Sequence, residues 1–393
     1  MKRGSPLVDD SRVAGSSPAG SEPPDPAQPD PAGWSFGGKR VAGLRGRAGD
    51  TAHTLGIVIA LLALGVLFTI LQPRFGSLYN IGNIVSQSSI LGIMATGMTF
   101  AIVSGEIDLS VGSTFALCAI AFALFLQAGW NVYLAIVAAV ALGAAAGLCN
   151  GILSVLFSVP SIIITLGTLN VYSGLALYIS KGLPISNFRT TGPLFSFGQN
   201  TVPGPAFVSW IPQLAIAWLV VGMIGYWVLH STAFGMRVYA TGSNRQAAVN
   251  AGISDVRVRL QVLALVGGSA GLAGVLSVGQ YGSASPGAGA TYNLTVIAAV
   301  IIGGAALYGG HGSVLASAIG VLILGEVNNG LIIAGANLYG QVIAHGALVV
   351  LAVAIDRLSH GNAWYFAAAR RRLRSLSAAL GRAPEIRSVP KRY

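Results

Sequence analysis

The sequence predicts an all-α integral membrane protein with about ten transmembrane helices and both termini in the cytoplasm. Hydrophobic residues make up 53% of the 393 residues and charged residues only 9%, whereas soluble domains carry about 25% charged residues. Long uncharged runs, separated by short polar segments, are typical of helices that cross a bilayer. So few charges exclude a cytosolic enzyme, a nucleic-acid-binding protein and a secreted disulfide-rich scaffold.

Residues 1–50 are predicted to form a disordered cytoplasmic segment. Seven prolines lie among Ser, Gly and Asp, and large aliphatic residues are almost absent. Such a segment cannot bury enough apolar surface to offset the entropy lost on ordering. It also lacks the apolar stretch and cleavage site of a signal peptide.

The predicted membrane domain, residues 51–356, contains ten apolar runs. The first run, residues 52–72, has no formal charge, and a helix of this length rises roughly 31 Å, enough to cross a bilayer core. The other runs lie at about 84–103, 109–129, 132–157, 161–180, 209–230, 260–281, 293–309, 314–334 and 338–355.

The basic residues set the predicted orientation. Arg237, Arg245, Arg257 and Arg259 cluster between the sixth and seventh runs. Together with the basic residues before the first run and after the tenth, they should face the cytoplasm under the positive-inside rule. Even numbers of crossings separate these three regions, so both termini are predicted to be cytoplasmic and the loop 182–208 external. Merging the second and third runs would break this parity, so we keep them separate.

The C-terminal residues 357–393 are predicted to form a basic cytoplasmic tail. They hold nine Lys and Arg residues against one acidic residue, Glu385. This tail supplies most of the net charge of +11. A membrane anchor explains it better than a surface for a phosphate backbone, so no nucleic-acid partner is expected.

Glycines repeat every four residues in two of the predicted helices. Gly143, Gly147 and Gly151 share one helix face, and Gly267 with Gly271 repeats the spacing. Small residues at this spacing let two helix backbones approach closely in lipid. Close packing is the favoured interpretation, and a glycine hinge is the alternative.

No catalytic constellation is present in the sequence. No lysine follows a phosphate-binding glycine loop, and the five histidines show no metal-ligand spacing. The chain is therefore predicted not to be an enzyme and to hold no cofactor or metal of its own.

Three acidic residues fall in the membrane region, where each costs about 2.5–3.5 kcal/mol at a helix centre. They are Glu106, Asp108 and Glu326. Asp108 or Ser110 is expected to cap the helix that follows, and a proton relay is the alternative. Near Glu326, the polar Asn328 and Asn329 either line a hydrated path or bond to a neighbouring helix.

The segment 231–260 contains a short predicted helix between two spanning helices. Asn244 is expected to cap this helix, which runs to Ala251, and Gly252 ends it. A short helix bounded in this way is typical of a rigid projection that contacts a partner protein. The alternative is a solvated connector.

Several motifs carry a family resemblance, and they follow one another over residues 50 to about 356. They are Ser104-Gly105-x-Ile107-Asp108-Leu109-Ser110-Val111-Gly112-Ser113, Pro160-Ser161-Ile162-Ile163-Ile164-Thr165-Leu166-Gly167-Thr168-Leu169, Phe234-Gly235 with Gly242-x-Asn244-x-x-Ala247-Ala248 and Gly252-Ile253, Ile302-Gly303-Gly304 with Gly309-Gly310-x-Gly312-Ser313, and Asn328-Asn329-Gly330-Leu331. With them the chain resembles the membrane permease subunit of ribose/xylose/galactose-type ABC importers.

The resemblance implies a set of partners and a location. It implies a homodimeric pore in the bacterial inner membrane, surrounded by lipid. It also implies a cytoplasmic ABC ATPase subunit that binds ATP and Mg²⁺, and a periplasmic or lipid-anchored sugar-binding protein. The implied function is a translocation path for a monosaccharide.

The resemblance also implies two sets of site residues. Coupling to the ATPase is expected at Gly242, Asn244, Arg245, Ala247, Ala248 and Gly252. The translocation path or its gate is expected to involve Gly105, Asp108, Ser110, Thr165, Glu326, Asn328 and Asn329.

Three residues depart from the usual pattern of these permeases. Glu106 stands where glycine is usual, His311 where arginine is usual, and Glu326 where an aliphatic residue is common. Each is expected either to alter which sugar passes or to tune packing. Two alternative functions stay open: an ABC permease for branched-chain amino acids or nucleosides, and an ion-coupled secondary carrier that uses Glu106, Asp108 or Glu326.

Overall fold

The computed structural model describes residues 39–205 and 208–337 together with a few positions between 340 and 350, and its side chains are described from Thr54 onward. The chain divides into two units, residues 1–49 and residues 50–393, and the helix bundle belongs to the second. Three predicted regions lie wholly or mostly outside the described side chains: the N-terminal segment 1–50, the tenth span 338–355 and the basic tail 357–393.

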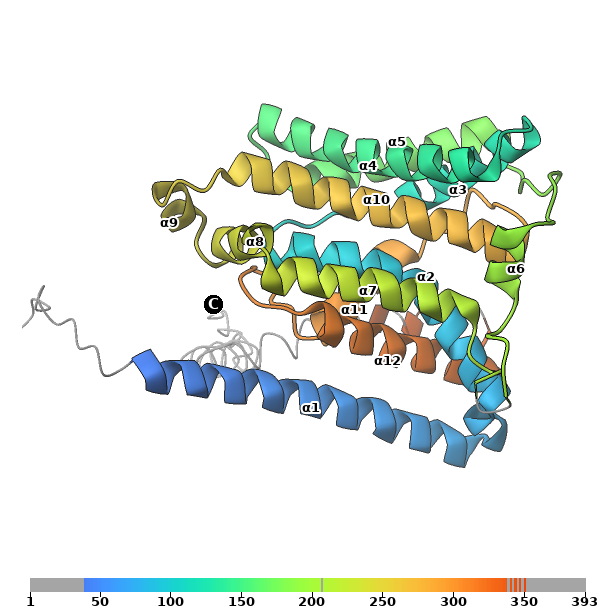
Figure 1. Ribbon diagram of the computed structural model, residues 1–393, viewed down its shortest axis with the longest axis horizontal. Coiled ribbons are helices and arrows are strands. Elements are labelled where there is room, and N and C mark those ends of the chain that lie inside the picture. Colours follow the sequence, from blue (N-terminus) through green and yellow to red (C-terminus); the bar gives the residue numbers. More distant parts are fainter. Residues whose placement is uncertain are drawn as a thin grey trace, which may run out of the picture. The chain divides into compact units, whose positions relative to one another are not determined.

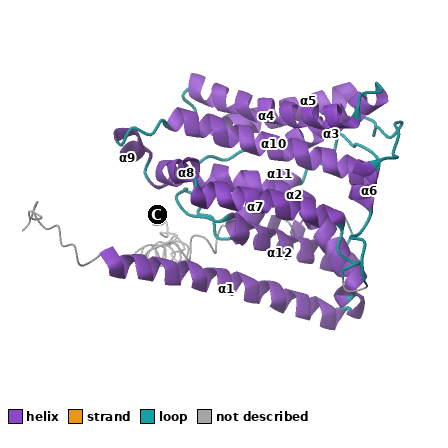
Figure 2. Ribbon diagram, viewed as in Figure 1, coloured by secondary structure: helices purple, strands orange, loops and turns teal. Residues whose placement is uncertain are grey.

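All regular elements of the described residues are helices (Figure 2). They are α1 (Lys39–Leu71), the 3-10 helix η1 (Pro73–Gly76), α2 (Leu78–Val103), α3 (Val111–Gln127), α4 (Val132–Leu156), α5 (Ser161–Ser180), α6 (Pro193–Gln199), α7 (Gln213–Ser231), α8 (Ala233–Ser243), α9 (Arg245–Asn250), α10 (Asp255–Tyr281), α11 (Tyr292–Ile302) and α12 (Val314–Ile333). Nine of them match the first nine predicted spans, and seven are long and apolar enough to cross a membrane.

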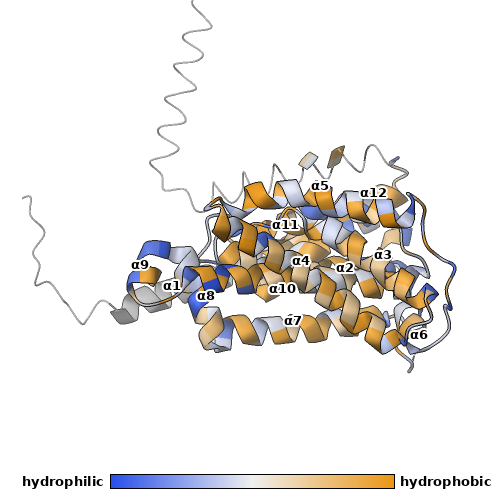
Figure 3. Ribbon diagram, turned by 90° about the horizontal axis from the view of Figure 1, so that it is seen from above, coloured by the Kyte–Doolittle hydropathy of each residue, from blue (hydrophilic) through white to orange (hydrophobic). Residues whose placement is uncertain are grey.

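Helices α2 and α10 form the centre of the bundle. In Figure 1, α10 runs beneath α4 and above α2 and α7, and it packs against α4, α2 and α3. Both central helices are largely buried, whereas α4, α5 and α7 expose large apolar side chains such as Val137, Ile163 and Trp227. Figure 3 shows this hydrophobic colouring along the long helices. An apolar outer surface with internally bonded backbone is what lipid requires, so the predicted all-α membrane class is confirmed.

The predicted glycine packing is confirmed at the seam between α4 and α10. A Cβ added to Gly147 would lie 2.0 Å from the carbonyl oxygen of Leu263, and one added to Gly271 would lie 2.9 Å from that of Ala139. The backbones of the two helices therefore meet with no room for a side chain between them.

Two predicted spans are shorter in the structure than the apolar runs suggest. Helix α3 has 17 residues and α11 has 11, and the second half of the predicted span 293–309 is not helical. The chain instead leaves α11 at Ile302 and turns through Gly304, Gly309 and Gly310, which all have positive φ. Glycine adopts such angles without steric penalty, so the helix ends although the sequence stays apolar.

The two long connections lie at opposite ends of the bundle. Figures 1 and 3 place α8 and α9 at one end and α6, within the loop 182–208, at the other. The loop is fastened by a backbone bridge between Ile185 and Ala284 and by close approach of Gly198 to Gly279. This separation agrees with a topology in which the loop 182–208 and the α8–α9 segment face opposite sides of the membrane.

Candidate functional site

Three of the sequence motifs meet at one point, where glycines bring their backbones into contact. A Cβ on Gly309 would lie 2.9 Å from the nitrogen of Gly105 and 3.0 Å from the Cα of Gly242. In addition, the N–H of Gly310 donates to the carbonyl oxygen of Val103 at 2.8 Å. The end of α2, the end of α8 and the loop between α11 and α12 are therefore held together by close backbone contacts.

Helix α9 begins directly after this junction and projects from the end of the bundle (Figure 1). The side chain of Asn244 accepts the N–H of Ala247 at 3.0 Å, and Gly252 follows the helix with a φ of 84°. The predicted cap and terminator are thus confirmed. Of the residues expected to couple to the ATPase, Ala248 is buried, whereas Asn244, Arg245, Ala247 and Gly252 are exposed. This end of the bundle presents a short, exposed helix on a rigid base.

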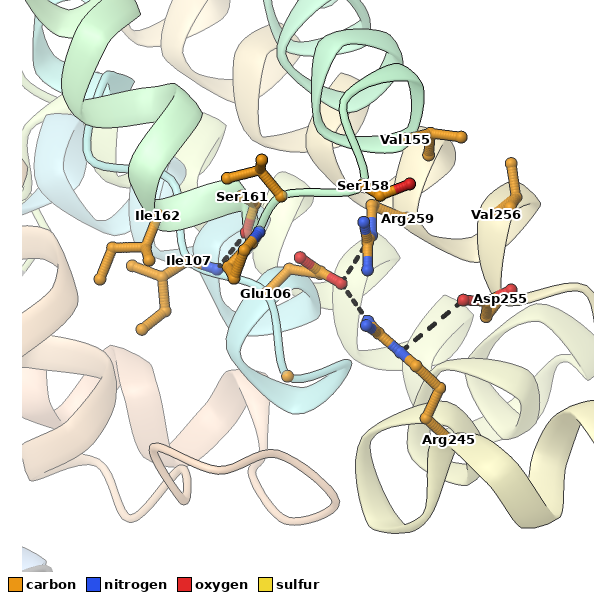
Figure 4. Close-up of a pocket in the computed structure, with 13 residues that line it drawn as sticks. Glu106, Ile107, Val155, Ser158, Ser161, Ile162, Arg245, Asp255, Val256 and Arg259 are labelled. Carbon is orange, nitrogen blue, oxygen red and sulfur yellow. Dashed lines mark hydrogen bonds and ion pairs between the residues drawn. The ribbon is translucent and has the colours of Figure 1, made fainter.

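The carboxylate of Glu106 pairs with two arginines (Figure 4). Its Oε1 accepts hydrogen bonds from Arg245, at the start of α9, and from Nε of Arg259 in α10 at 2.9 Å. The side chain of Glu106 is 4% exposed and that of Arg259 is 12% exposed. A buried carboxylate needs such partners. Asp255 lies farther from Arg245, with 3.8 Å between Oδ2 and Nε.

Sequence reasoning missed this cluster because it assigned Glu106 no basic partner. The signal available was topological: Arg245 and Arg259 were predicted at the same end of the bundle as the turn that carries Glu106. Because a charge near a membrane helix end is rarely left unpaired, those arginines were the nearest candidates. The structure supplies the two basic partners of Glu106 that the sequence analysis did not name.

The Glu106 cluster lines part of a cavity of about 540 Å³. Figure 4 shows Ile107 and Ser161 on one side of it, and Val155 and Val256 on another. Arg259 also donates from Nη1 to Oγ of Ser154 at 3.1 Å, which ties α10 to the end of α4. The cavity therefore lies among the α2–α3 loop, the α4–α5 connection and the starts of α9 and α10.

A buried polar network fixes the rest of the α2–α3 loop. Oδ1 of Asp108 accepts the N–H and the hydroxyl of Ser110 at 2.7 and 2.6 Å, and Asn150 of α4 donates to Oδ2 at 3.3 Å. The hydroxyl of Tyr172 in α5 donates to Asn150 at 3.1 Å. Burial raises the pKa of Asp108, and the hydrogen bonds from Ser110 and Asn150 lower it in part. Asp108 thus joins the loop to two helices.

The expected capping of α3 by Asp108 or Ser110 is wrong. Ser110 is the N-cap residue, but its side chain caps no N–H of the helix and points to Asp108 instead. The free N–H of Gly112 is accepted by the side chain of Asn293 from α11 at 2.6 Å. A residue 181 positions away therefore supplies the cap, which local sequence patterns do not reveal.

Thr165 belongs to the same site. Its Oγ1 accepts the N–H of Leu109 at 3.0 Å, and Oγ of Ser161 accepts that of Ile107 at 3.2 Å. The structure therefore brings together four of the residues expected at the translocation path or gate. They are Gly105, Asp108, Ser110 and Thr165.

The other three expected path residues lie on α12, apart from this loop. Asn329 accepts a hydrogen bond from Asn80 of α2 at 2.8 Å. Of the two roles expected for this residue, lining a hydrated path or bonding to a neighbouring helix, the structure shows the second. Glu326 approaches α1, where a Cβ on Gly65 would lie 3.3 Å from Oε1 of the acid. Oε2 of Glu326 is buried and accepts no hydrogen bond from the described residues. Asn328, next to Asn329, is partly buried.

The titratable side chains do not gather into a metal site within the part of the chain that the structure describes. No group of three or more His, Cys, Asp or Glu residues there is placed to hold an ion. The arrangement instead binds segments together: arginines, amides and hydroxyls fasten one loop to α4, α5, α9, α10 and α11.

Comparisons with known proteins match most of the chain. A family model described as "Branched-chain amino acid transport system / permease component" matches residues 80–353. The ribose import permease protein RbsC of Bacillus subtilis (strain 168) is 38% identical over 303 residues, covering 77% of this chain and 92% of that protein. The protein of the same name from Escherichia coli (strain K12) is 38% identical over 304 residues, covering 76% and 92%.

A relative with a different named cargo also matches. The autoinducer 2 import system permease protein LsrC of Salmonella typhi is 32% identical over 307 residues, which cover 74% of this chain and 85% of that protein. No solved structure matches the chain.

Proposed function

The chain belongs to the family described as branched-chain amino acid transport system / permease component, and from this membership we propose that it is the permease subunit of an ABC importer that passes a monosaccharide across the bacterial inner membrane. The proposed cargo rests on the 38% identity to ribose import permeases over 92% of their length. The chain acts in transport and not in catalysis.

The energy for import is proposed to come from a separate ABC ATPase subunit that holds ATP and Mg²⁺. The exposed helix α9 supports a separate ATPase partner. It follows directly on the close contact of Gly309 with Gly105 and Gly242, and it offers a rigid surface for that partner. The sequence has no phosphate-binding loop of its own. An extracytoplasmic sugar-binding protein would deliver the cargo, and a second copy of the chain would complete the pore.

A second cargo has a specific observation in its favour. The 32% identity to LsrC extends over 85% of that protein, and LsrC is named for import of autoinducer 2. The family description names branched-chain amino acids instead. The higher identity of the ribose import permeases favours a monosaccharide over both.

Uptake in a strain that lacks this chain tests the proposal. Labelled ribose, xylose, galactose, autoinducer 2 and leucine are offered in turn, before and after the chain is restored. We expect restored uptake of one of the sugars, and loss of that uptake when the catalytic residues of the ATPase partner are inactivated. Restored uptake of leucine or autoinducer 2 alone would replace the proposed cargo.

Reconstitution in proteoliposomes tests the source of energy. We expect the purified chain alone to hydrolyse no ATP and to accumulate no sugar against a gradient. Addition of the ATPase partner, MgATP and the binding protein should start uphill uptake. Uphill uptake by the chain alone that an uncoupler abolishes would establish the ion-coupled carrier in its place.

A further inference from the structure

Glu106 joins three parts of the chain that are far apart in the sequence. Its Oε1 accepts hydrogen bonds from Arg245, the first residue of α9, and from Arg259 in α10. Arg259 in turn reaches Ser154 near the end of α4 at 3.1 Å. Because the side chain of Glu106 is only 4% exposed and that of Arg259 12%, salt and water screen the ion pair between them weakly.

The loop that carries Glu106 is also fastened to the start of α5. The N–H groups of Ile107 and Leu109 donate to the hydroxyls of Ser161 and Thr165 at 3.2 and 3.0 Å. Ser161 is the first residue of α5, and Thr165 lies one turn farther along the helix. A displacement of the loop must therefore carry the first turns of α5 with it or break these hydrogen bonds.

Helix α9 makes its ion pairs through Arg245, which lies near two acids, Glu106 and Asp255. Ala248 is the buried residue of this helix, and the side chain of Arg245 is 43% exposed while its guanidinium reaches inward to Glu106. The second acid near Arg245 is Asp255, which is 28% exposed and 3.8 Å away. A partly exposed pair at that distance contributes little. Of these two acids, Glu106 therefore makes the stronger contact with α9.

We propose that Glu106 is a positioning residue that couples α9 to the α2–α3 loop, so that a movement of α9 passes to the first turns of α5. The ion pairs of Glu106 stay formed during this movement, so they link α9 mechanically to the α2–α3 loop. The inference rests on the proposed function, in which an ATPase partner moves α9. Glu106 then sets how much sugar crosses for each ATP hydrolysed, beyond its part in holding the fold.

The ratio of sugar transported to ATP hydrolysed tests this role. The complete importer, with ATPase partner and binding protein, is reconstituted with either wild-type permease or Glu106→Gln, and both quantities are measured in the same vesicles. We expect the ratio to fall about fivefold or more in Glu106→Gln, the range of a typical coupling between two sites. Asp255→Asn removes the weaker acid beside Arg245 and is the matched control, with an unchanged ratio.

A covalent tie provides a second test that does not depend on the stability of Glu106→Gln. Cysteines replace Glu106 and Arg245 in a background where the two natural cysteines, Cys118 and Cys149, are changed to alanine. The uncross-linked pair should be uncoupled, and a short bismaleimide that joins the two positions should restore the ratio. Uptake that stays uncoupled, or stops, after cross-linking would show that the contact has to open and would overturn the tie.

The two proposals fail in different ways. If the wild-type importer shows no ATP-driven uptake of any sugar, the proposed function is wrong. If it shows such uptake and Glu106→Gln keeps the same ratio, the function stands and only the role of Glu106 is refuted. A lower rate of uptake and of ATP hydrolysis at an unchanged ratio would assign Glu106 to stability alone.

Discussion

The seam between α4 and α10 makes the single substitution Gly267→Ala a sharp test of the packing. A Cβ at this position would lie 2.0 Å from the carbonyl oxygen of Gly143 and 2.9 Å from the nitrogen of Gly147. Carbon and oxygen atoms in close contact are about 3.3 Å apart. The two helices would therefore have to separate by about 1.3 Å at their closest point to admit one methyl group.

The neighbouring Gly268 offers a matched control for the size of the effect. A Cβ there would meet only Ala144, at an ordinary 3.7 Å. Both substitutions gain the same helix propensity of about 1 kcal/mol, so this gain cancels between them. Overpacking costs about 1–3 kcal/mol, and backbone pressed against backbone has no rotamer to relieve it. We expect Gly267→Ala to be less stable than Gly268→Ala by about 3 kcal/mol.

Unfolding by SDS in mixed micelles measures this difference. The tryptophan fluorescence of the chain, which has six Trp residues, reports the transition for each variant. A clearly lower midpoint for Gly267→Ala is the expected result. Equal midpoints for the two variants would refute the backbone contact between α4 and α10 and, with it, the interpretation of the four-residue glycine spacing.

Three further substitutions test other contacts. Asn150→Leu removes a donor to the buried Asp108 and should lower the free energy of unfolding by about 1–3 kcal/mol in the same titration; an unchanged midpoint would contradict the network. Asn329→Leu removes the bond from Asn80 and should lower it by about 1 kcal/mol, the usual size for polar bonds between membrane helices; no change would mean that the bond adds nothing. Gly252→Ala places a side chain at a φ of 84° in open space, which should leave membrane insertion intact on an immunoblot and reduce sugar uptake; full uptake would contradict the role of α9.

The long spanning helices and the short helix α9 were predictable because their signals are local. An uncharged run such as residues 132–157 needs only its own composition to indicate a spanning helix, and α4 covers nearly the same residues. Likewise, Asn244 and Gly252 bound α9 through a side-chain cap and a left-handed turn within a few residues. Local steric and hydrogen-bonding rules suffice in such cases.

The end of α11 was not predictable from hydropathy. Apolar residues such as Ala305 and Leu307 continue past Ile302. Hydropathy averaged along the sequence therefore indicates one continuous apolar run. The chain turns because Gly304 and Gly309 adopt positive φ and pack against other segments. Hydropathy measures only whether a segment prefers lipid and carries no information on where its backbone bends.

The partners of Glu106 could not be read from the sequence for a different reason. Arg259 lies 153 positions away, and which of several arginines meets the acid depends on how α10 packs on α4. That packing follows in turn from the glycine seam. Topology narrows the choice to the basic residues at one end of the bundle, and the fold selects Arg245 and Arg259 among them.

The surroundings of the three acids bear on the source of energy for transport. An ion-coupled carrier passes protons or cations along titratable groups that face one another. Here each acid has a separate local setting: Glu106 is held by two arginines, Asp108 by uncharged hydrogen-bond donors, and Glu326 lies against the backbone of α1 at Gly65. A carboxylate held by two guanidinium groups is suited to hold segments of the chain together. The separate settings of the three acids support the proposal that the energy for transport comes from another chain, acting through α9.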